Sequence, residues 1–594
     1  MPSFQSVICS LFTFYAVPIW ASALQHPFND QSPLSNSLNT TPNEWDLEVG
    51  PNPNATGIVM ASSTFLFLCL QTEGWSSTGH NLVPGTVPPG TLLYHGRSDD
   101  QMPKNPEWCA VDPEHSYMFC RTRQPGTGCW HLTLATTRPL KVLYFDGSGA
   151  AKMEDGSMDT QDMIAWGKIM PEKFFQERER IKALCDWGQR FEVDGFVRME
   201  MDFEIMLCDF TKGVEVVSFL ELRSRNRRFP GGPRHGSDNP SPASPIYHEH
   251  PPPMPHPPPP GVDFGSPSSS SFPPGPGRPE GRFDEALNSG SWHSRFPGET
   301  RIKLDLTRLV SFYDTSLVPS LVDVRFGKPR LEHRVLGASE EDLKRVINKV
   351  EEMLTEEDVI STGSNGVDWR ALFHVLVDRY GNRLEVVRYL LNLTDTNAFD
   401  SDENDEDKEY LVRAKSVQEQ LDIMLRPYLI YSAVPPSPNS DSLSWASPIF
   451  KLCATTHTRY ISSQSLTPSE TLLNAFQETN REICRVITRM WIRGVVDGGL
   501  NDELSPNPRE KAQAEDGDGD DEDDNNVPLK SLLTTWRQEI DTLMSWLDWS
   551  VWLRCRPECG FDEFCYLPTW PYFRRGEDQD WKDPQPKCIP RLQA

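Results

Sequence analysis

Short apolar runs separated by turn residues dominate the chain between residues 45 and 224. They are rich in β-branched and aromatic residues and are bounded by Pro, Gly or Thr, which is typical of strands. The predicted strands cover 57–70, 91–96, 129–136 and 140–146. A segment from Pro171 to Gly188 has apolar residues at helical spacing and a proline in its first turn, so it predicts a helix. Residues 45–224 are therefore expected to form an α+β domain.

The clearest alternation in the chain is DGFVRMEMDFEIMLCDF, from Asp194 to Phe210. Apolar residues occupy every second position from Val197 to Leu207. The positions between them hold Arg198, Glu200, Asp202 and Glu204. Because successive side chains of a strand point to opposite faces, this pattern predicts one strand with three acids on its polar face. Glu204 and Glu200 are the candidate catalytic acids.

Beyond residue 300 the apolar residues recur at three- and four-residue spacing, which predicts helices. The segment 338–358 has such a stripe, and Ser339 is placed to cap it. Further helices are predicted at 367–392, 467–491 and 529–554. The last carries four tryptophans, expected to form a core rather than a sugar-binding surface. We therefore expect a mostly α-helical domain over 301–510, followed by a Trp-rich helix and Cys-rich tail over 528–594.

A change in composition separates these two halves. From residue 225 to 300 the chain is rich in Pro, Ser and Gly and has too few apolar side chains to form a core, which predicts a disordered linker. The pair Arg227–Arg228 in this linker is of the kind that processing proteases cut, although ordinary solubilising charge is the more frequent role of such a pair. Two acidic runs, near 395–409 and at 511–527, are expected to be solvated loops because their like charges repel.

The N-terminus predicts export. An apolar stretch is followed by Ala21, Ser22 and Ala23, the small-residue pattern that signal peptidase accepts. Residues 1–23 are expected to be a signal peptide, and residues 24–44 a flexible segment. No other stretch is long and apolar enough to predict a transmembrane helix, so we expect a secreted, extracellular protein.

The cysteine count agrees with export. Thirteen cysteines less Cys9 in the leader leave twelve, an even number, as expected where thiols pair into disulfides. The disulfide candidates are Cys69, Cys109, Cys120, Cys129, Cys185, Cys208, Cys453, Cys484, Cys555, Cys559, Cys565 and Cys588. We expect the tail cysteines to pair with one another rather than to bind zinc, and predict no metal site. Asn39, Asn54 and Asn392 begin N-x-Thr sequons and are candidates for glycosylation.

The net charge of −27 disfavours nucleic acid as a partner, because phosphate binding depends on clustered Lys and Arg. The sequence also lacks a serine nucleophile elbow, a phosphate-binding glycine loop and a His-Glu-x-x-His motif. Common hydrolase, kinase and metalloprotease classes are therefore disfavoured. A small-molecule nucleotide and an extracellular protein remain as partner classes.

The stretch TLLYHGR, residues 91–97, followed by PEWCAVDPEHSYMFC and LKVLYFD, resembles the start of the ADP-ribosyltransferase fold. The resemblance implies a mixed sheet and NAD as the cofactor, with His95 bonding a ribose hydroxyl and the Gly96 backbone holding the nicotinamide amide. Trp108 stands near the position of the family's stacking Tyr, and Arg97 replaces the usual Thr. Glu204, or Glu200, would then stabilise the oxocarbenium-like transition state as nicotinamide leaves.

Two other functions stay open. The strand of acids also resembles the Asp-x-x-Asp-x-Asp-x-Glu strand of chitinase-type glycosidases, although Val197 stands where the first Asp should be. Alternatively the acids are the solvated face of an antiparallel sheet, in a non-catalytic extracellular or cell-wall-associated protein. Through DGFVRMEMDFEIMLCDF and DWRALFHVLVDRYGNRLEVVRYLLN the chain is also similar to large secreted fungal proteins of no assigned activity, which implies no mechanism.

Overall fold

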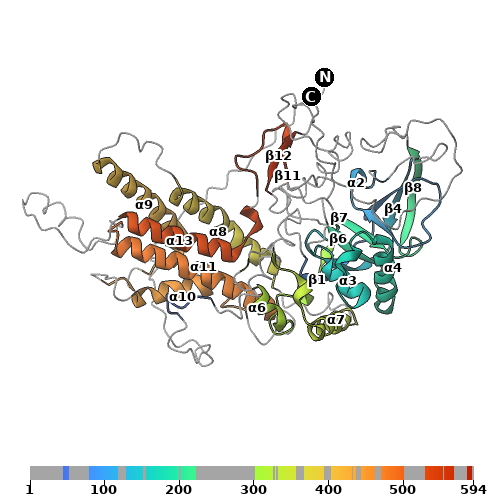
Figure 1. The fold of residues 1–594 in the computed structure, drawn as a ribbon, viewed down its shortest axis with the longest axis horizontal. Helices are drawn as coiled ribbons and strands as arrows, with labels where there is room; N and C mark the ends of the chain where they lie inside the picture. Colours follow the sequence, from blue (N-terminus) through green and yellow to red (C-terminus); the bar gives the residue numbers. More distant parts are fainter. Residues whose placement is uncertain are drawn as a thin grey trace, which may run out of the picture.

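The protein has a sheet-containing part and a helical part, as the computed structural model in Figure 1 shows. The structure describes residues 45–51, 79–117, 119, 129–150, 156–199, 203–222, 301–325, 328, 332–355, 367–393, 403–430, 433–435, 443–461, 470–500, 529–552, 554–566 and 585–590. The predicted signal peptide, the segment 24–44, the predicted strand 57–70, the linker 225–300 and the acidic loop 511–527 lie outside the described residues.

In the described residues the sheet has ten strands, and its order is β10-β1-β5-β6-β7-β3-β2-β4-β8, with β9 also paired to β1. The strands are β1 (Asn81–Val87), β2 (Leu92–Arg97), β3 (Glu107–Ala110), β4 (Cys129–Thr136), β5 (Leu140–Phe145), β6 (Gly195–Met199), β7 (Phe203–Leu207), β8 (Val214–Leu222), β9 (Lys303–Leu304) and β10 (Val310–Ser311). Only the β5–β6 pair among them is parallel, so the sheet is mixed.

A parallel pair requires a crossover connection, and here two helices supply it. They are α3 (Asp159–Trp166) and α4 (Glu177–Gly188), which follow β5 and precede β6. With α7 (Glu340–Thr355) they bury one apolar face of the sheet, and the short α2 (Pro113–Tyr117) and α6 (Val322–Arg325) lie in the connections. The opposite face has its own core around Val142, Leu132 and Ile205. The α+β prediction is confirmed.

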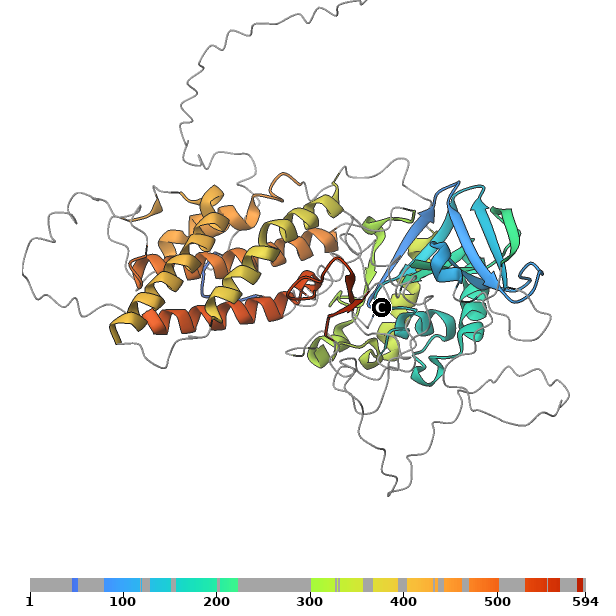
Figure 2. The same cartoon turned by 90° about the horizontal axis from the view of Figure 1, so that it is seen from above.

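The C-terminal part is mostly helical, as predicted (Figure 2). Its helices are α8 (Trp369–Leu391), α9 (Glu403–Leu425), α10 (Ser447–Thr455), α11 (Glu470–Val496) and α13 (Leu529–Leu547). The tryptophans of the last stripe belong to the core, as expected: Trp536 and Trp549 are buried, and Trp546 and Trp552 pack against the same cluster. Among the described residues, no helix is long and apolar enough to span a membrane.

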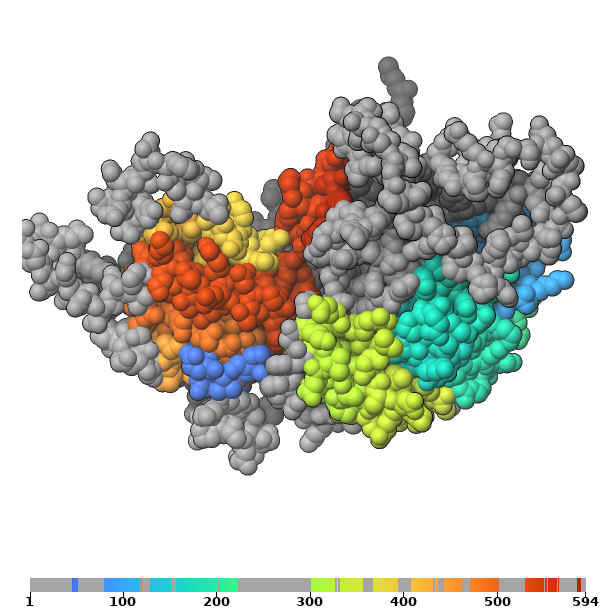
Figure 3. Space-filling view, in the orientation of Figure 1, coloured from blue at the N-terminus to red at the C-terminus, as the bar shows by residue number. Residues whose placement is uncertain are grey.

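Each part is completed by a segment from the other half of the sequence. Residues 45–51 lie on the helical part, where Trp45 packs edge-on against Phe450 and Leu47 is buried (Figure 3). Residues 301–355 lie on the sheet part, because β9 and β10 both pair with β1. This differs from the domains expected over 45–224 and 301–510. Composition marks where a linker runs but does not reveal which core its flanks join.

Two local predictions need correction. The stretch from Asp194 to Phe210 is a hairpin of β6 and β7, not one strand, because Met199 pairs with Phe203. Its alternation is nearly symmetric about Met201, so apolar residues pair with apolar residues when the chain folds back, and the pattern fits either structure. The helix expected from Pro171 instead begins at Glu177, after a short 3₁₀ turn at Pro171–Lys173.

Further along, the acidic run expected to be a loop over 395–409 is partly helical, since α9 begins at Glu403. Acidic residues stabilise the first turns of a helix through its dipole, so the charge run is compatible with a helix start. The cap on α7 is confirmed, because the Asp342 backbone N–H donates to the Ser339 hydroxyl at 3.1 Å.

The prediction of disulfides is confirmed. The described bridges are Cys185–Cys208, Cys453–Cys484, Cys555–Cys565 and Cys559–Cys588, and Cys129 is also disulfide-bonded. The last two bridges brace the tail hairpin of β11 (Glu563–Tyr566) and β12 (Lys587–Pro590). Cys109 was a disulfide candidate and is instead a free, fully buried thiol in the sheet core. Cys69 and Cys120 lie outside the described residues.

The exchange of segments gives a direct test. If a specific protease site is introduced between residues 231 and 290 and cut, the two fragments are expected to co-elute on size exclusion under native, non-reducing conditions. They should stay together because β9 and β10 pair with β1 and Leu47 is buried among the helices. In strong denaturant the fragments should separate, as no described disulfide joins the two halves. Native elution as two folded, independent pieces would contradict this arrangement.

Candidate functional site

A buried arginine organises the helix-covered face of the sheet. Arg198 on β6 has 1% of its surface exposed. Its Nε donates to Glu204 Oε1 at 2.5 Å, its Nη1 donates to Gln161 Oε1 at 3.2 Å, and its Nη2 donates to Glu177. Burial alone would lower the pKa of Arg198, but the two carboxylates outweigh it and raise that pKa. Glu204 is therefore held by a fixed cation.

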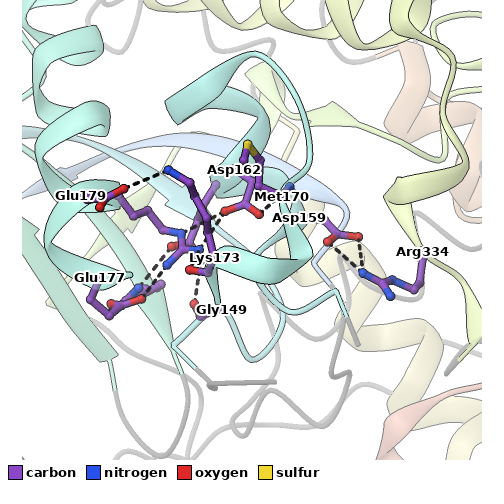
Figure 4. Close-up of polar contacts among 11 residues, drawn as sticks. Gly149, Asp159, Asp162, Met170, Lys173, Glu177, Glu179 and Arg334 are labelled. Atoms are coloured by element: carbon purple, nitrogen blue, oxygen red, sulfur yellow. Dashed lines mark hydrogen bonds and ion pairs between the residues drawn. The ribbon is translucent and has the colours of Figure 1, made fainter. Parts of the chain in front are cut away.

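A second buried arginine extends this network (Figure 4). Arg180 on α4 donates to Asp162 Oδ1 from Nε at 3.1 Å and from Nη2 at 2.9 Å, and to Glu177 Oε1 from Nη1 at 2.8 Å. Burial raises the pKa of Asp162 to about 6, although Arg180 acts in the opposite direction. Glu177 thus links the two guanidinium groups, one on a strand and one on a helix.

The segment after the linker also reaches this region. Arg334 donates from Nη2 to Asp159 Oδ1 at 3.2 Å, and Asp159 is at the start of α3. Figure 4 shows this pair beside the Asp162 cluster, with Arg334 coming from a different part of the chain. Burial raises the pKa of Asp159 in spite of Arg334. Residues 301–355 therefore contribute charge as well as strands to the sheet part.

His95 lies in a separate cluster on β2 and β3. Its Nδ1 is 2.7 Å from the Trp108 carbonyl oxygen, so Nδ1 donates, and its Nε2 is 2.9 Å from Glu107 Oε2. Arg97 donates to both oxygens of Glu107, at 3.1 and 3.2 Å. Burial would raise the pKa of Glu107, but its contacts with His95 and Arg97 outweigh burial and lower it. His95 thus ties β2 to β3 where the two strands diverge.

The strand register decides which candidate residues share a face. Tyr94 pairs with Ala110, Ala110 with Glu204, and Glu204 with Arg198, which places these four residues in one row across β2, β3, β7 and β6. Paired residues of antiparallel strands point to the same face, and neighbours along a strand point to opposite faces. His95, next to Tyr94, therefore faces away from Glu204. The structure does not bring these two predicted residues together.

Gly96 and two residues missed at the sequence level lie on the same face as Glu204. Gly96 pairs with His131 of β4, and the rings of His131 and Tyr94 are stacked with centroids 5.9 Å apart. His131 Nε2 is 2.7 Å from the Ser116 hydroxyl. Burial lowers the pKa of His131 and raises that of Tyr94. The alternation of β4 places His131 opposite its buried leucines, a signal that could have marked it as a candidate.

The remaining predicted residues have simpler positions. Trp108 packs edge-on against Phe119 with ring centroids 4.0 Å apart, and its carbonyl serves His95. Cys109 faces the other core, where burial raises the pKa of its thiol. Glu200 lies outside the described residues. In the described part of the chain, side chains close enough to hold a metal occur in the tail and are chiefly cysteines engaged in disulfides.

Comparison with known proteins shows similarity to part of the chain. Residues 127–231 match a family model described as the YPL277C N-terminal domain, a range that includes β4 through β8. The uncharacterized protein YPL277C of Saccharomyces cerevisiae is 33% identical over 198 residues, which cover 25% of this chain and 40% of that protein. The uncharacterized protein YOR389W of the same organism is 34% identical over 197 residues, covering 25% and 31%.

The chain therefore spans less than half the length of these relatives. No solved structure matches it. The similarities support a fungal family of unassigned activity, and the matched range contains both Arg198 and Glu204.

Replacing Arg198 by Met is expected to lower the free energy of unfolding of the sheet part by about 3–5 kcal/mol, because Glu177 and Glu204 would stay buried without their shared cation. The matched control is Arg190→Met, which removes a largely exposed ion pair with Glu351 and should cost about 1 kcal/mol or less. Urea denaturation measures both. Equal losses in the two variants would contradict the central role of Arg198.

The raised pKa of Asp162 gives a pH-dependent prediction. In the folded chain this carboxyl keeps its proton up to about pH 6, whereas in the unfolded chain it ionises near 3.8. Folding therefore takes up a proton between these values, and stability falls as pH rises through them. Relative to Asp162→Asn, the free energy of unfolding of the wild type should fall by about 3 kcal/mol between about pH 4 and pH 6. Above pH 6 the difference between the two proteins should stay constant. Denaturation across this range tests it, and a stability difference independent of pH would be evidence against it.

Proposed function

We propose that this is an exported, disulfide-bonded protein whose sheet part binds NAD and acts as an ADP-ribosyltransferase-like enzyme. The observation that carries the proposal is the row from Tyr94 through Ala110 to Glu204, with Gly96 beside it on the same face. The resemblance of TLLYHGR to that family indicates NAD as the cofactor. The register gives a glycine backbone and an acid on one face of the sheet, where Glu204 is 5% exposed and Ala110 is fully buried.

The spacing of the residues along this row is on the scale of a nucleoside. Neighbouring strands lie about 4.8 Å apart, so Tyr94 and Glu204, two strands apart, are separated by about 10 Å at the backbone. Between them stands Ala110, whose side chain is a single methyl group, and next to Tyr94 on this face is Gly96. Tyr94 and His131 provide stacked rings at one end. The nicotinamide would lie near Gly96 and these rings, with the ribose toward Glu204.

Glu204 is suited to act on the ribose. In the described residues its hydrogen bond to Arg198 uses Oε1, which leaves Oε2 to accept a ribose hydroxyl. In the proposed reaction the bond between nicotinamide nitrogen and ribose C1′ breaks, and nicotinamide leaves with the electron pair. The carboxylate stabilises the positive charge on the ribose. Water or an acceptor group then attacks C1′ and loses a proton.

His95 has a different role in this proposal from the one that the family resemblance implies. It bonds the Trp108 carbonyl and Glu107, so it is a positioning residue that fixes the strand carrying Gly96.

Export is supported by the disulfides, which persist in oxidising compartments. Asn392 is the described glycosylation candidate; it is exposed just after α8, and its side-chain amide donates to the Arg388 carbonyl at 2.9 Å. Asn39 and Asn54 lie outside the described residues.

One observation favours a second candidate, a non-catalytic extracellular protein. Arg198 forms ion pairs with both Glu204 and Glu177, as in a purely structural ion pair network. The glycosidase alternative requires two carboxyl groups flanking a sugar, and in the described residues the nearest partner carboxylate on this network, Glu177, shares the same guanidinium. The glycosidase alternative stays a prediction, without further support.

The experiment measures NAD binding and nicotinamide release by the full chain. NAD at about 100 times its Kd should stabilise the wild type by about 2.7 kcal/mol, seen as a rise in Tm. Glu204→Gln should retain binding and lose nicotinamide release by about 100-fold or more. The matched control Glu179→Gln alters an exposed acid on α4 and should match the wild type.

Absence of both a Tm shift and nicotinamide release in the wild type would refute the proposal and favour the non-catalytic candidate. Unchanged release in Glu204→Gln would refute the role of Glu204 while leaving NAD binding in place.

A further inference from the structure

Strand β8 forms one end of the sheet, beside β4 (Figure 1). Among the residues that the structure describes, β8 pairs with β4 alone, from Val214 opposite Thr136 to Leu222 opposite Cys129. The outer edge of such a strand carries backbone N–H and C=O groups that another strand can bind. Proteins usually protect these edges with lysine, proline or very short strands. This strand has nine residues and neither lysine nor proline, and a register shift between Thr133 and Leu134 marks a β-bulge within its pairing with β4.

The side chains of β8 are unusually apolar for an exposed edge. Val216, Val217 and Leu220 are 50%, 56% and 55% exposed. They lie within five successive residues, and we call these three side chains the apolar strip. Because the β4–β8 pair has a register shift between Thr133 and Leu134, Val216 pairs with Leu134 and Leu220 pairs with His131, which places Val216 and Leu220 on opposite faces of the sheet. Burial of such a strip against a partner strand would be favourable, at roughly 25 cal/mol per Å² of apolar surface. Backbone groups and side chains of β8 thus both favour strand addition.

The charges on β8 indicate what kind of segment would bind. Glu215 and Glu221 flank the apolar strip, the strand has no Lys or Arg, and neither glutamate forms an ion pair with a described residue. Opposite charges on paired strands stabilise a sheet, and like charges directly opposite destabilise it. A segment with basic residues near both ends matches this pattern.

The same charges disfavour a second copy of this chain. Pairing two β8 strands would gather four carboxylates along one joint with no cation on either strand. Each copy also carries a net charge of −27, which adds repulsion. The partner is therefore expected to be a different protein.

We propose that β8 binds an extended segment of a partner protein by strand addition, the segment being apolar in its middle and having Lys or Arg near both ends. Backbone hydrogen bonds would provide affinity, and the apolar strip with its two flanking glutamates would provide specificity. The outer edge of β8 is separate from the row of Tyr94, which lies two strands away, although Leu220 of β8 pairs with His131, whose ring lies at one end of the proposed NAD site.

The experiment uses the full chain and a labelled peptide, Lys-Lys-Val-Thr-Val-Thr-Val-Lys-Lys, with fluorescence anisotropy as the measurement. Two matched peptides serve as controls: one with Glu in place of every Lys, and one with alternate backbone amides N-methylated. The protein variants are V216K/L220K, which places charges in the apolar strip, and E215K/E221K, which reverses the flanking charges. The control variant is Val412→Lys on α9, an apolar residue of 65% exposure far along the chain.

The basic peptide should bind the wild type. The acidic peptide should bind at least about tenfold more weakly, because its carboxylates would lie opposite Glu215 and Glu221. N-methylation should abolish binding. V216K/L220K should weaken binding about tenfold or more, E215K/E221K should reverse the preference between the basic and acidic peptides, and V412K should change nothing. Because the altered side chains are largely exposed, all variants should unfold at the wild-type temperature.

Three results would overturn the proposal. One is equal binding of the N-methylated peptide, which would show simple charge attraction rather than strand addition. Another is binding that V216K/L220K leaves intact. The third is a wild-type dimer, detected by sedimentation, that V216K/L220K dissociates while no peptide binds, which would assign the edge to a second copy.

Discussion

The sheet part depends on the burial of one permanent positive charge. The Arg198 guanidinium cannot lose its proton in a protein, so carboxylates must accompany it into the core. Those carboxylates come from β7 and α4, and Gln161 from α3 adds a third contact while also donating to the Gly149 carbonyl at 2.7 Å. One side chain thus fixes the hairpin, both crossover helices and the loop after β5. The position of Glu204 in the proposed site follows from this constraint.

The exchange of segments makes the two halves of the chain interdependent. The sheet part is completed by residues 301–355, and the helical part by residues 45–51, where Arg485 donates to the Leu47 carbonyl at 2.9 Å. Arg301 also bonds Asp112, at 3.0 Å, close to the short helix α2 behind the Tyr94 row. A fragment that ends at residue 224 would therefore lack both strands of the edge at β1 and a contact beside the proposed site.

Much of the fold could be predicted from the sequence, because local periodicity was strong. The helices α4, α7, α8, α11 and α13, the strands β2, β4 and β5 and the cap at Ser339 have patterns that depend on near neighbours alone. The hairpin at β6 and β7 could not be told from a single strand, since folding back preserves the alternation of faces. The pairing of His95 with Glu107 was not predicted either. It depends on how two strands diverge, which single-strand periodicity does not contain.

For the candidate site, the sequence identified Gly96 and Glu204, but their shared face follows from the register across β3. Tyr94 and His131 were missed because each is an ordinary strand residue until the strands pair. The central claim is that these residues form one nucleotide-binding face. Photo-crosslinking of the full chain with an azido analogue of NAD, followed by peptide mapping, tests this most directly. The account predicts adducts in residues 91–97 or 129–136 that unlabelled NAD suppresses. Adducts confined to other segments, or adducts that NAD does not suppress, would contradict it.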